Sequence, residues 1–410
     1  MRRLRCLSAA VLALAALAVG ACGGDDNGGG GGGGDTIQVG ASLPLTGEFS
    51  EPGKAAKQGY EVWEALVNEK GGLLDGRKVK MVFKDDGSNQ NTIVADYNAL
   101  ISKDKAELLL GTFSSLLNLP ASVVAERNRK LFVEPAGGSP ELFSRGFKHL
   151  FFSQQATADH QGDLWEEYVA NLPNNERPKT AAYPTLDDPF AQPTSEGIET
   201  ILKAAGIKSV YRKTYTIDNS NLDSIASNVK ASGADIVIHG ATFEDGVGMV
   251  RALLKANYKP DWLYQTTAPS LGDQYAKAIG AGNTEGVFYA VSHSAEAETP
   301  GNPEFVAKYK EMFGGTEVPE DAADGYAAAE VMQAAVEGVG SIDDQLKLAD
   351  WLREHEVQTI LGPLSWDKDG RPKGEFLVGQ WQSGVPEIVL PEAAATTEEI
   401  LPQWEPGGAG

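Results

Sequence analysis

From Thr36 onward, short apolar runs rich in β-branched residues alternate with longer segments that carry a single apolar stripe. The run Ile37–Leu43 predicts a strand, and residues 53–69 predict a helix whose buried stripe includes Tyr60 and Trp63. The same alternation predicts further strands at 79–83, 107–110 and 131–133, and helices at 91–102 and 116–128. Strands that alternate with helices are typical of a parallel sheet covered by helices.

The alternation starts again after Asp159. It predicts helices at 161–171, 194–205, 222–231 and 244–256, and strands at 180–183, 210–214 and 234–238. Two similar α/β units in succession suggest two lobes of one architecture. Beyond them, the pattern predicts strands at 286–291 and 376–381, with helices between them at 303–313, 321–338 and 344–354. This extension could complete the first lobe by returning to it.

The first residues of the chain form a pattern of their own. Arg2, Arg3 and Arg5 precede an apolar run at 7–19, and small residues come just before Cys22. This pattern is typical of a bacterial lipoprotein signal, in which the cysteine becomes the lipidated first residue of the mature protein. An ordinary cleaved signal peptide that happens to contain the cysteine is the alternative. The apolar run is too short for a transmembrane helix, which needs about 20 residues.

We therefore expect a signal peptide at 1–21, a lipid anchor on Cys22 and a glycine-rich tether at 22–35. The folded part would begin near Thr36, on the extracytoplasmic face of the cell membrane, to which the lipid holds it. Roughly 370 residues then remain, which is enough for two domains.

Charge and cysteine content narrow the classes of partner. The chain has 35 basic and 57 acidic residues and a net charge of −22. Nucleic acid is therefore not an expected partner, because its binding depends on clustered Lys and Arg. The two cysteines, Cys6 and Cys22, both lie in the N-terminal segment. The folded part thus has no cysteine to pair in a disulfide.

Catalytic and metal-binding patterns are weak. The five histidines are scattered, with no spacing that would place two on one helix face as metal ligands. The chain lacks the Gly-x-Ser-x-Gly motif of serine hydrolases and the Gly-x4-Gly-Lys-Ser/Thr phosphate-binding loop. Paired acids at Asp85-Asp86 and Asp187-Asp188 follow predicted strands, where turn formation is the simpler explanation. We expect no enzyme activity, no metal and no cofactor.

Two loops after successive predicted strands carry a candidate binding site. Ser114 and Ser115 follow the strand at 107–110, and the loop 135–141 follows the strand at 131–133. Ligands bind beyond the carboxyl ends of parallel strands, where helix N-termini present free N–H groups. Together the loops could hold a carboxylate or an amide through hydroxyl and backbone N–H groups. Alternatively, each serine only caps a helix.

In their order and spacing, several segments resemble the branched-chain amino acid binding proteins, the leucine-type group of type I periplasmic solute-binding lipoproteins of ABC transporters. The similarity runs from Ile37 to about Trp381. It rests on the segments 43–47, 68–76 and 361–367, on Asp85-Asp86, Ser114-Ser115 and Pro135-Ala136, and on Gly325-Tyr326.

The resemblance implies an α/β fold of two Rossmann-like lobes with central parallel sheets, joined by a three-crossover hinge. It places lobe 1 at 36–154 and 291–375, lobe 2 at 155–290 and 376–391, and a C-terminal tail at 392–410. The crossovers would lie near 153–156, 289–292 and 376. A small ligand would bind in the cleft between the lobes.

The resemblance also implies roles for individual residues. Ser115 and the loop of Ala136, Gly137 and Gly138 would hold a ligand carboxylate, and Phe190 would pack on the ligand. Further contacts are expected from Ser114, Thr242 and Thr267, and from Phe49 in place of a family aromatic that Pro52 matches. Gly87 and Ser114 stand at the positions of a disulfide found in some members.

Two departures from the family bear on the ligand. Gly138 stands where leucine-type members have a threonine that helps to hold the carboxylate, and Thr267 where they have a glutamate that neutralises the ammonium group. A buried ammonium without a partner anion is costly. Either Glu244 or Asp245 therefore takes that role, or the ligand has no α-amino group. We favour the second hypothesis.

The implied function is capture of a small amino acid, or of a related carboxylate, amide or aromatic metabolite, and its delivery to an ABC permease in the membrane. We expect a monomer that catalyses no reaction. One alternative is a ligand-sensing receptor of the same fold that signals through a membrane partner. Another is an extracytoplasmic hydrolase, for which no motif supplies a nucleophile and a base.

Overall fold

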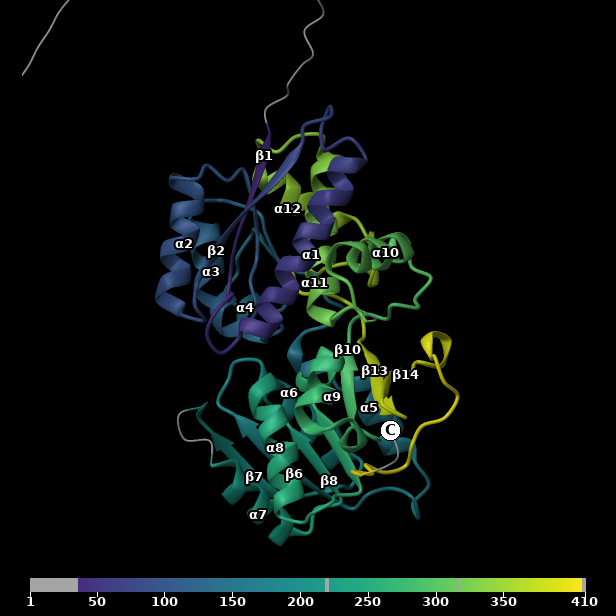
Figure 1. Cartoon of the computed structure of the whole chain (residues 1–410). Helices are drawn as coiled ribbons and strands as arrows, with labels where there is room; N and C mark the ends of the chain where they lie inside the picture. Colours follow the sequence, from purple (N-terminus) through teal and green to yellow (C-terminus); the bar gives the residue numbers. More distant parts are fainter. Residues whose placement is uncertain (1–35, 218–220, 316, 408–410) are drawn as a thin grey trace, which may run out of the picture. The chain divides into compact units, whose positions relative to one another are not determined.

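In the computed structural model, which describes residues 36–217, 221–315 and 317–407, the strands of the first part of the chain form a five-stranded sheet (Figure 1). Its order is β2-β1-β3-β4-β5, and all neighbouring strands are parallel. The strands are β1 (Ile37–Leu43), β2 (Val79–Asp85), β3 (Leu108–Leu110), β4 (Phe132–Glu134) and β5 (Leu150–Phe152). The helices are α1 (Ser50–Glu69), α2 (Gln90–Ser102), α3 (Ser115–Arg127), α4 (Pro140–Phe143), α10 (Asn302–Phe313), α11 (Glu320–Val339) and α12 (Gln345–Glu354), followed by the hairpin of β11 (Val357–Thr359) and β12 (Gly362–Leu364).

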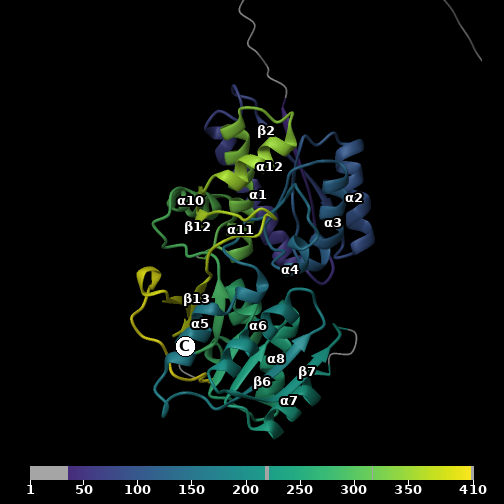
Figure 2. The same ribbon diagram turned by 180° about the vertical axis from the view of Figure 1, so that it is seen from behind.

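Alternation along the strands divides the buried side chains between two cores. Leu108 and Leu110 belong to the core built with α1 and α11, whereas Leu109 belongs to the core built with α2 and α3. Figures 1 and 2 show α11 beside α1, although the two helices are far apart in the sequence. Their close contact needs glycine, because a Cβ at Gly59 would lie 1.9 Å from the Ala322 carbonyl oxygen. This packing fixes the start of α11 against the first sheet.

The rest of the chain forms a seven-stranded sheet in the order β14-β13-β10-β9-β8-β6-β7. Its strands are β6 (Thr180–Leu186), β7 (Lys208–Tyr215), β8 (Ile236–His239), β9 (Trp262–Gln265), β10 (Phe288–Val291), β13 (Leu377–Gln382) and β14 (Val385–Leu390). The helices are α5 (Asp163–Asn171), α6 (Ala191–Ala204), α7 (Leu222–Ser232), α8 (Phe243–Lys255) and α9 (Asp273–Ile279), with short 3₁₀ helices η1 (Ala158–His160), η3 (Ala268–Leu271), η4 (Ala281–Asn283) and η5 (Glu392–Ala394). The first five strands pair in parallel, and β13 and β14 add an antiparallel edge.

The chain passes between the two sheets three times. It leaves the five-stranded sheet after β5, returns to it after β10 and enters the seven-stranded sheet again at β13. Near these crossings, Gln155 Nε2 donates hydrogen bonds to the carbonyl oxygens of Ser292 (2.7 Å) and Leu361 (3.3 Å). The predicted fold class is confirmed, and the antiparallel edge is an addition that the sequence pattern did not indicate.

Five strands, β5, β9, β11, β12 and β14, had no counterpart among the predicted elements, and two of them, β5 and β9, belong to the parallel part of a sheet. All residues of both strands are buried, so neither shows the alternation that marks a half-exposed strand. Helix α1 begins at Ser50, before the predicted start at residue 53. Pro52 is compatible with this earlier start, because the first turn of a helix tolerates proline.

Residues after β14 return to the seven-stranded sheet. Trp404 is 0% exposed and belongs to the same hydrophobic core as Tyr275 and Trp381. Its backbone N–H donates to the Asp261 carbonyl oxygen (2.7 Å), and its indole N–H donates to that of Asn283 (2.9 Å). The segment expected as a tail therefore packs as part of this sheet's core at least as far as Trp404.

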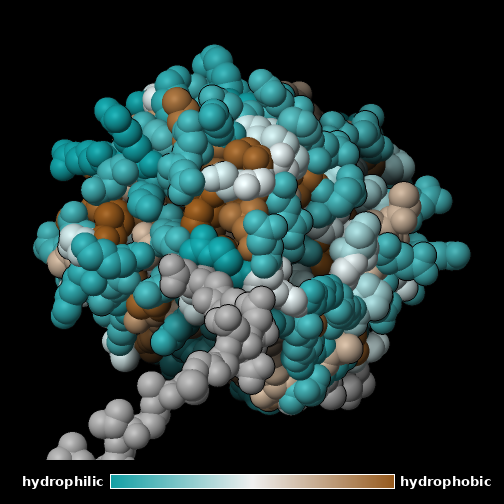
Figure 3. Space-filling view, turned by 90° about the horizontal axis from the view of Figure 1, so that it is seen from above, coloured by the Kyte–Doolittle hydropathy of each residue, from teal (hydrophilic) through white to brown (hydrophobic). Residues whose placement is uncertain are grey.

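The expected signal peptide, Cys22 and the tether at 22–35 lie outside the described residues. Within the described ranges, no helix combines the length and the apolar character needed to cross a membrane. The face drawn in Figure 3 carries mainly hydrophilic side chains, with hydrophobic ones in small separate groups. This surface agrees with the acidic composition of the chain.

Candidate functional site

Loops that follow strands of both sheets converge on one pocket of about 50 Å³. They are the loops after β3, β4, β5, β6, β8 and β9, joined by the start of α11. The carboxyl ends of parallel strands are where α/β proteins bind ligands. The lining residues are Phe113, Ser114, Ser115, Ala136, Gln154, Gln161, Asp188, Phe190, Thr242, Thr266, Thr267, Ser270, Glu320, Asp321 and Asp324.

Four helices begin at this pocket. Helix α3 begins at Ser115, α6 follows Phe190, α8 follows Thr242 and α11 begins at Glu320. The first turn of a helix has N–H groups without intrahelical partners, and the helix dipole gives it a positive partial charge. The walls of the pocket are therefore rich in hydrogen-bond donors.

The two serines at the start of α3 differ in their partners. Ser115 Oγ accepts a hydrogen bond from the Ser139 backbone N–H (3.1 Å), which ties α3 to the loop after β4. Ser114 is 5% exposed, and its hydroxyl oxygen has no partner among the residues that the structure describes. The same holds for Oε1 of Gln161, a residue that is 8% exposed. Buried polar atoms are almost always hydrogen-bonded, so both atoms are available to a ligand.

Behind the loop after β4 lies a buried acid, Glu134. Its Oε2 atom accepts hydrogen bonds from Asn118 Nδ2 (3.0 Å) and from the Ala136 backbone N–H (3.1 Å). Burial raises the pKa of the Glu134 carboxyl well above its usual value, which favours its neutral form. A Cβ at Gly137 would lie 2.5 Å from Oε2, so the loop needs glycine there. Glu134 thus takes the N–H of Ala136, a residue of the loop that the resemblance assigns to a ligand carboxylate.

Four acidic residues line the pocket, and two of them, Asp188 and Glu320, accept hydrogen bonds from backbone N–H groups. Asp188 Oδ1 accepts hydrogen bonds from the backbone N–H groups of Phe190 (2.8 Å) and Ala191 (3.1 Å) at the start of α6. Glu320 accepts a hydrogen bond from the Ser292 backbone N–H. Burial raises the pKa of both carboxyls. The positions of Asp188 and Glu320 are explained by these backbone contacts.

The other two acids, Asp321 and Asp324, lie further along the start of α11. Asp324 accepts hydrogen bonds from Ser292 Oγ (2.6 Å) and Gln154 Nε2 (2.5 Å). Asp321 is 7% exposed, and its carboxylate accepts no hydrogen bond within the described part of the chain. Burial, together with the Glu320 carboxylate, raises the pKa of Asp321 to about 8. No Lys, Arg or His is among the described lining residues, so this acidic wall faces no cation in the pocket.

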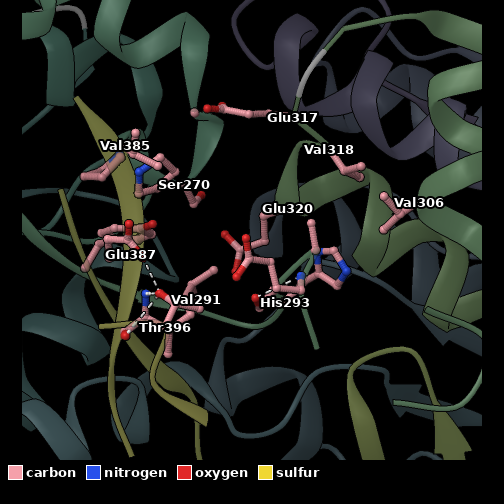
Figure 4. Close-up of a pocket in the computed structure, with 18 of the residues that line it drawn as sticks. Ser270, Val291, His293, Val306, Glu317, Val318, Glu320, Val385, Glu387 and Thr396 are labelled. Atoms are coloured by element: carbon pink, nitrogen blue, oxygen red, sulfur yellow. Dashed lines mark hydrogen bonds between the residues drawn. The ribbon is translucent and has the colours of Figure 1, made fainter. Parts of the chain in front are cut away.

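A second pocket, of about 310 Å³, shares Ser270 and Glu320 with the first. Figure 4 shows Val385 and Thr396 on one side of it and Glu320 and His293 on the other. Although it is larger, none of the described buried polar atoms that lack a partner lines it. The first pocket is therefore the better candidate for a specific binding site.

Comparison with known proteins identifies the family to which the chain belongs. A family model described as periplasmic binding protein matches residues 36–386. The chain belongs to the periplasmic binding protein family. An amino acid binding protein of Pseudomonas aeruginosa is 27% identical over 354 residues, which cover 84% of this chain and 90% of that protein. A Leu/Ile/Val/Thr-binding protein of Salmonella typhimurium is 26% identical over 359 residues, covering 85% of this chain and 92% of that protein.

Solved structures share the fold of this periplasmic binding protein. LivJ of Streptococcus pneumoniae, a branched-chain amino acid transporter substrate-binding protein in complex with isoleucine, has a TM-score of 0.74 at 17% identity and covers 87% of this chain and 100% of that one. An ABC transporter solute-binding protein of R. palustris in complex with benzoate has a TM-score of 0.74 at 19% identity. The match covers 90% of this chain and 99% of that one. The predicted family is confirmed, and the chain is a solute-binding protein.

In this periplasmic binding protein, the pocket brings together six residues predicted as ligand contacts: Ser114, Ser115, Ala136, Phe190, Thr242 and Thr267. The other four predicted residues are not part of its lining. Phe49 packs on Phe113, with 5.7 Å between the ring centroids. Gly137 and Gly138 belong to the loop after β4, and Glu244 is exposed in the first turn of α8.

The acids of α11 and the glutamines Gln154 and Gln161 were absent from the sequence-based prediction. A signal for the acids was present in the helix predicted at 321–338, which is rich in alanine and apolar on most sides. Such a helix is buried. Asp321 and Asp324, three residues apart, lie on one face of it and are therefore buried with it.

Proposed function

We propose that this periplasmic binding protein captures a small polar solute in the pocket at the strand ends and delivers it to the permease of an ABC importer. The observation that carries the proposal is the convergence of six loops on a pocket in which Ser114 Oγ and Gln161 Oε1 lack partners among the described residues. A bound solute would supply these hydrogen-bond partners. Its binding would be favoured because a buried polar atom without a hydrogen bond costs about 1–3 kcal/mol. Named amino acid binding proteins of the same family support a small organic solute.

Contacts to the solute would come from both sheets. Ser114 and Ser115 supply hydroxyl groups from the five-stranded sheet, and Thr242 and Thr267 supply them from loops of the seven-stranded sheet. Phe190 offers an aromatic surface at the start of α6. Ala136 would contribute a carbon contact rather than its N–H, which Glu134 occupies.

We assign the two sheets to lobes at 36–154 with 291–375 and at 155–290 with 376–391, which is the division expected from the sequence. A solute that contacts both lobes favours the arrangement in which they are closed. The difference in affinity between the closed and open forms is the driving force of closure. No chemical step is needed for this function.

The N-terminal pattern extends the proposal to the location of the protein. A lipid on Cys22 would hold it at the extracytoplasmic face of the cell membrane. A flexible tether at 22–35 would span about 20 Å root-mean-square, which keeps the binding site near a membrane permease.

The hydrolase alternative lacks the serine–histidine pair of a serine hydrolase among the described lining residues. Ser114 and Ser115 line the pocket, but no histidine is found among its described lining residues to activate them. A receptor of the same fold would bind its ligand in the same way, and a neighbouring permease and ATPase distinguish transport from sensing.

Replacement of Ser114 by alanine should weaken binding about tenfold, because the solute loses a hydrogen bond worth about 1–1.5 kcal/mol. The solute is first found by thermal shift in a panel of amino acids, amines, amides and aromatic acids, since a ligand that binds only the folded state raises the melting temperature. Its affinity for the wild type and Ser114→Ala is then measured by calorimetry.

Ser144→Ala is the matched control, because Ser144 is exposed and bonds only the Glu141 carbonyl oxygen within its own helix end. Its affinity should equal that of the wild type. A ligand whose affinity is unchanged in both Ser114→Ala and Ser115→Ala would show that the solute binds elsewhere.

A further inference from the structure

Helix α11 brings an unusual set of charges to the pocket. Glu320, Asp321 and Asp324 all line it; Asp321 and Asp324 are buried, and Glu320 is partly exposed. Carboxylates in the first turn of a helix are stabilised by its dipole, so the charge of Glu320 and Asp321 has an ordinary explanation. The burial of Asp321 is not explained in this way, because an exposed acid in the first turn has the same effect without loss of hydration. Asp324 lies in the second turn, beyond the reach of that effect.

Structural partners explain only part of this set. Glu320 accepts a hydrogen bond from the Ser292 backbone N–H. Asp324 accepts hydrogen bonds from Ser292 Oγ and Gln154 Nε2. These uncharged donors fix the orientation of the Asp324 carboxylate, but neither of them is a cation that would balance its charge. Asp321 has neither a hydrogen bond nor an ion pair within the described ranges.

Two polar atoms from other segments of the same pocket also indicate a ligand-binding site. Ser114 Oγ comes from the start of α3 and Gln161 Oε1 from the segment before α5, and both residues are more than nine-tenths buried. Neither atom has a partner among the described residues. The pocket therefore offers unbonded polar atoms as well as unbalanced carboxylates to one occupant.

The chemistry of that occupant follows from the charge of the walls. No Lys, Arg or His is present among the described lining residues, and no described group of three or more His, Cys, Asp or Glu is arranged to hold a metal ion. An organic cation with several N–H donors fits a wall of this kind, because charge-assisted hydrogen bonds are the strongest that a carboxylate accepts.

We infer that Asp321 and Asp324 form a cation subsite of the pocket, so that the solute carries an ammonium or guanidinium group. This inference rests on the proposed function and names its substrate class. It assigns to α11 the anionic role considered for Glu244 or Asp245, neither of which lines the pocket. It also replaces the hypothesis of a solute without an amino group.

The cation subsite determines the orientation of the solute in the pocket. Its cationic group lies at Asp321 and Asp324, and its other polar end lies at Ser114 and Ser115 near the positive end of the α3 dipole. A carboxylate, a hydroxyl or an amide suits that second end.

The test uses the mature protein and probes of defined charge. L-leucine, L-lysine, 1,4-diaminobutane and agmatine carry cationic nitrogen, whereas 4-methylpentanoate has the leucine skeleton without its ammonium group and benzoate is an aromatic anion. Thermal shift and calorimetry are expected to show binding by at least one of the cationic probes and by neither anion. If no cationic probe binds, the inference is wrong.

Two isosteric variants locate the contact. Asp321→Asn and Asp324→Asn should each weaken the best cationic probe at least tenfold, because each removes one charge-assisted hydrogen bond of about 1.5–3 kcal/mol. Glu337→Gln is the matched control, since Glu337 is exposed on the same helix. Circular dichroism and the melting temperature without ligand check folding, and if one variant does not fold, the other decides.

The outcomes separate the inference from the proposed function. An anion or uncharged solute that binds tightly, with affinity lost in Ser114→Ala and unchanged in Asp321→Asn and Asp324→Asn, overturns the cation subsite alone. Absence of binding by any probe in an extended metabolite panel overturns both. A tenfold loss in the Asn variants with no loss in Glu337→Gln supports both.

Discussion

Between pH 6 and pH 8, the affinity of the pocket for an ammonium-bearing solute is expected to rise more than about tenfold. Burial and the Glu320 carboxylate raise the pKa of Asp321 to about 8, so this carboxyl is mainly protonated at pH 6 in the free protein. A bound cation favours the ionised form and lowers that pKa. Binding therefore releases protons and strengthens as the pH rises toward 8, while an alkylammonium group with a pKa of about 10 stays charged.

The other charged groups of the pocket act in the same direction. Glu320 and Asp324 on α11, and Asp188 before α6, also have pKa values raised by burial. Among the described lining residues there is no Lys, Arg or His whose titration would oppose them. The rise in affinity and the number of protons released are measured by calorimetry at several pH values in buffers of different ionisation enthalpy.

Asp321→Asn is the control for this pH dependence, and its affinity should vary less with pH than that of the wild type. An affinity that is constant or falls between pH 6 and pH 8 would contradict the role of the α11 carboxyls. The same result would be expected for a solute held by exposed acids, whose pKa values lie far below this range.

Replacement of Trp404 by alanine is expected to lower the free energy of unfolding by about 3–5 kcal/mol. The side chain is fully buried in the core that contains Trp381, and its loss leaves a large cavity and an unbonded Asn283 carbonyl oxygen. Guanidinium unfolding followed by circular dichroism measures the change.

Phe313→Ala is the control, because Phe313 is 36% exposed at the end of α10. Its effect should be within about 1 kcal/mol. A loss of less than 1 kcal/mol in Trp404→Ala would show that the segment after β14 adds little to the seven-stranded sheet, contrary to its packing.

The alternating pattern predicts the fold well where an element is long and half-exposed. The predicted strand at Ile37–Leu43 is β1 with the same bounds, and the two α/β units are the two sheets. The pattern fails for β5 and β9, which are short and buried on both faces, because burial on both faces removes the alternation. It also gives no sign that Trp404 returns to the core, since one tryptophan in a polar segment has no periodicity.

The candidate site likewise has residues that the sequence predicts and residues that it does not. Ser114, Ser115 and Ala136 are predictable because loops after adjacent parallel strands meet at one edge of a sheet. Asp321 and Asp324 are close to them only through the return of α11 to α1, a contact between segments far apart in the sequence. No local pattern encodes that approach, and acids at a helix start are common for another reason.

A crystal structure of the protein with the tightest-binding cationic probe would show whether Asp321 and Asp324 hold the cationic group. We expect the cationic nitrogen within about 2.7–3.2 Å of a carboxylate oxygen of Asp321 or Asp324, with the other end of the probe at Ser114 or Ser115. A nitrogen bound at Glu244, or facing solvent while Asp321 and Asp324 contact no ligand atom, would contradict this expectation.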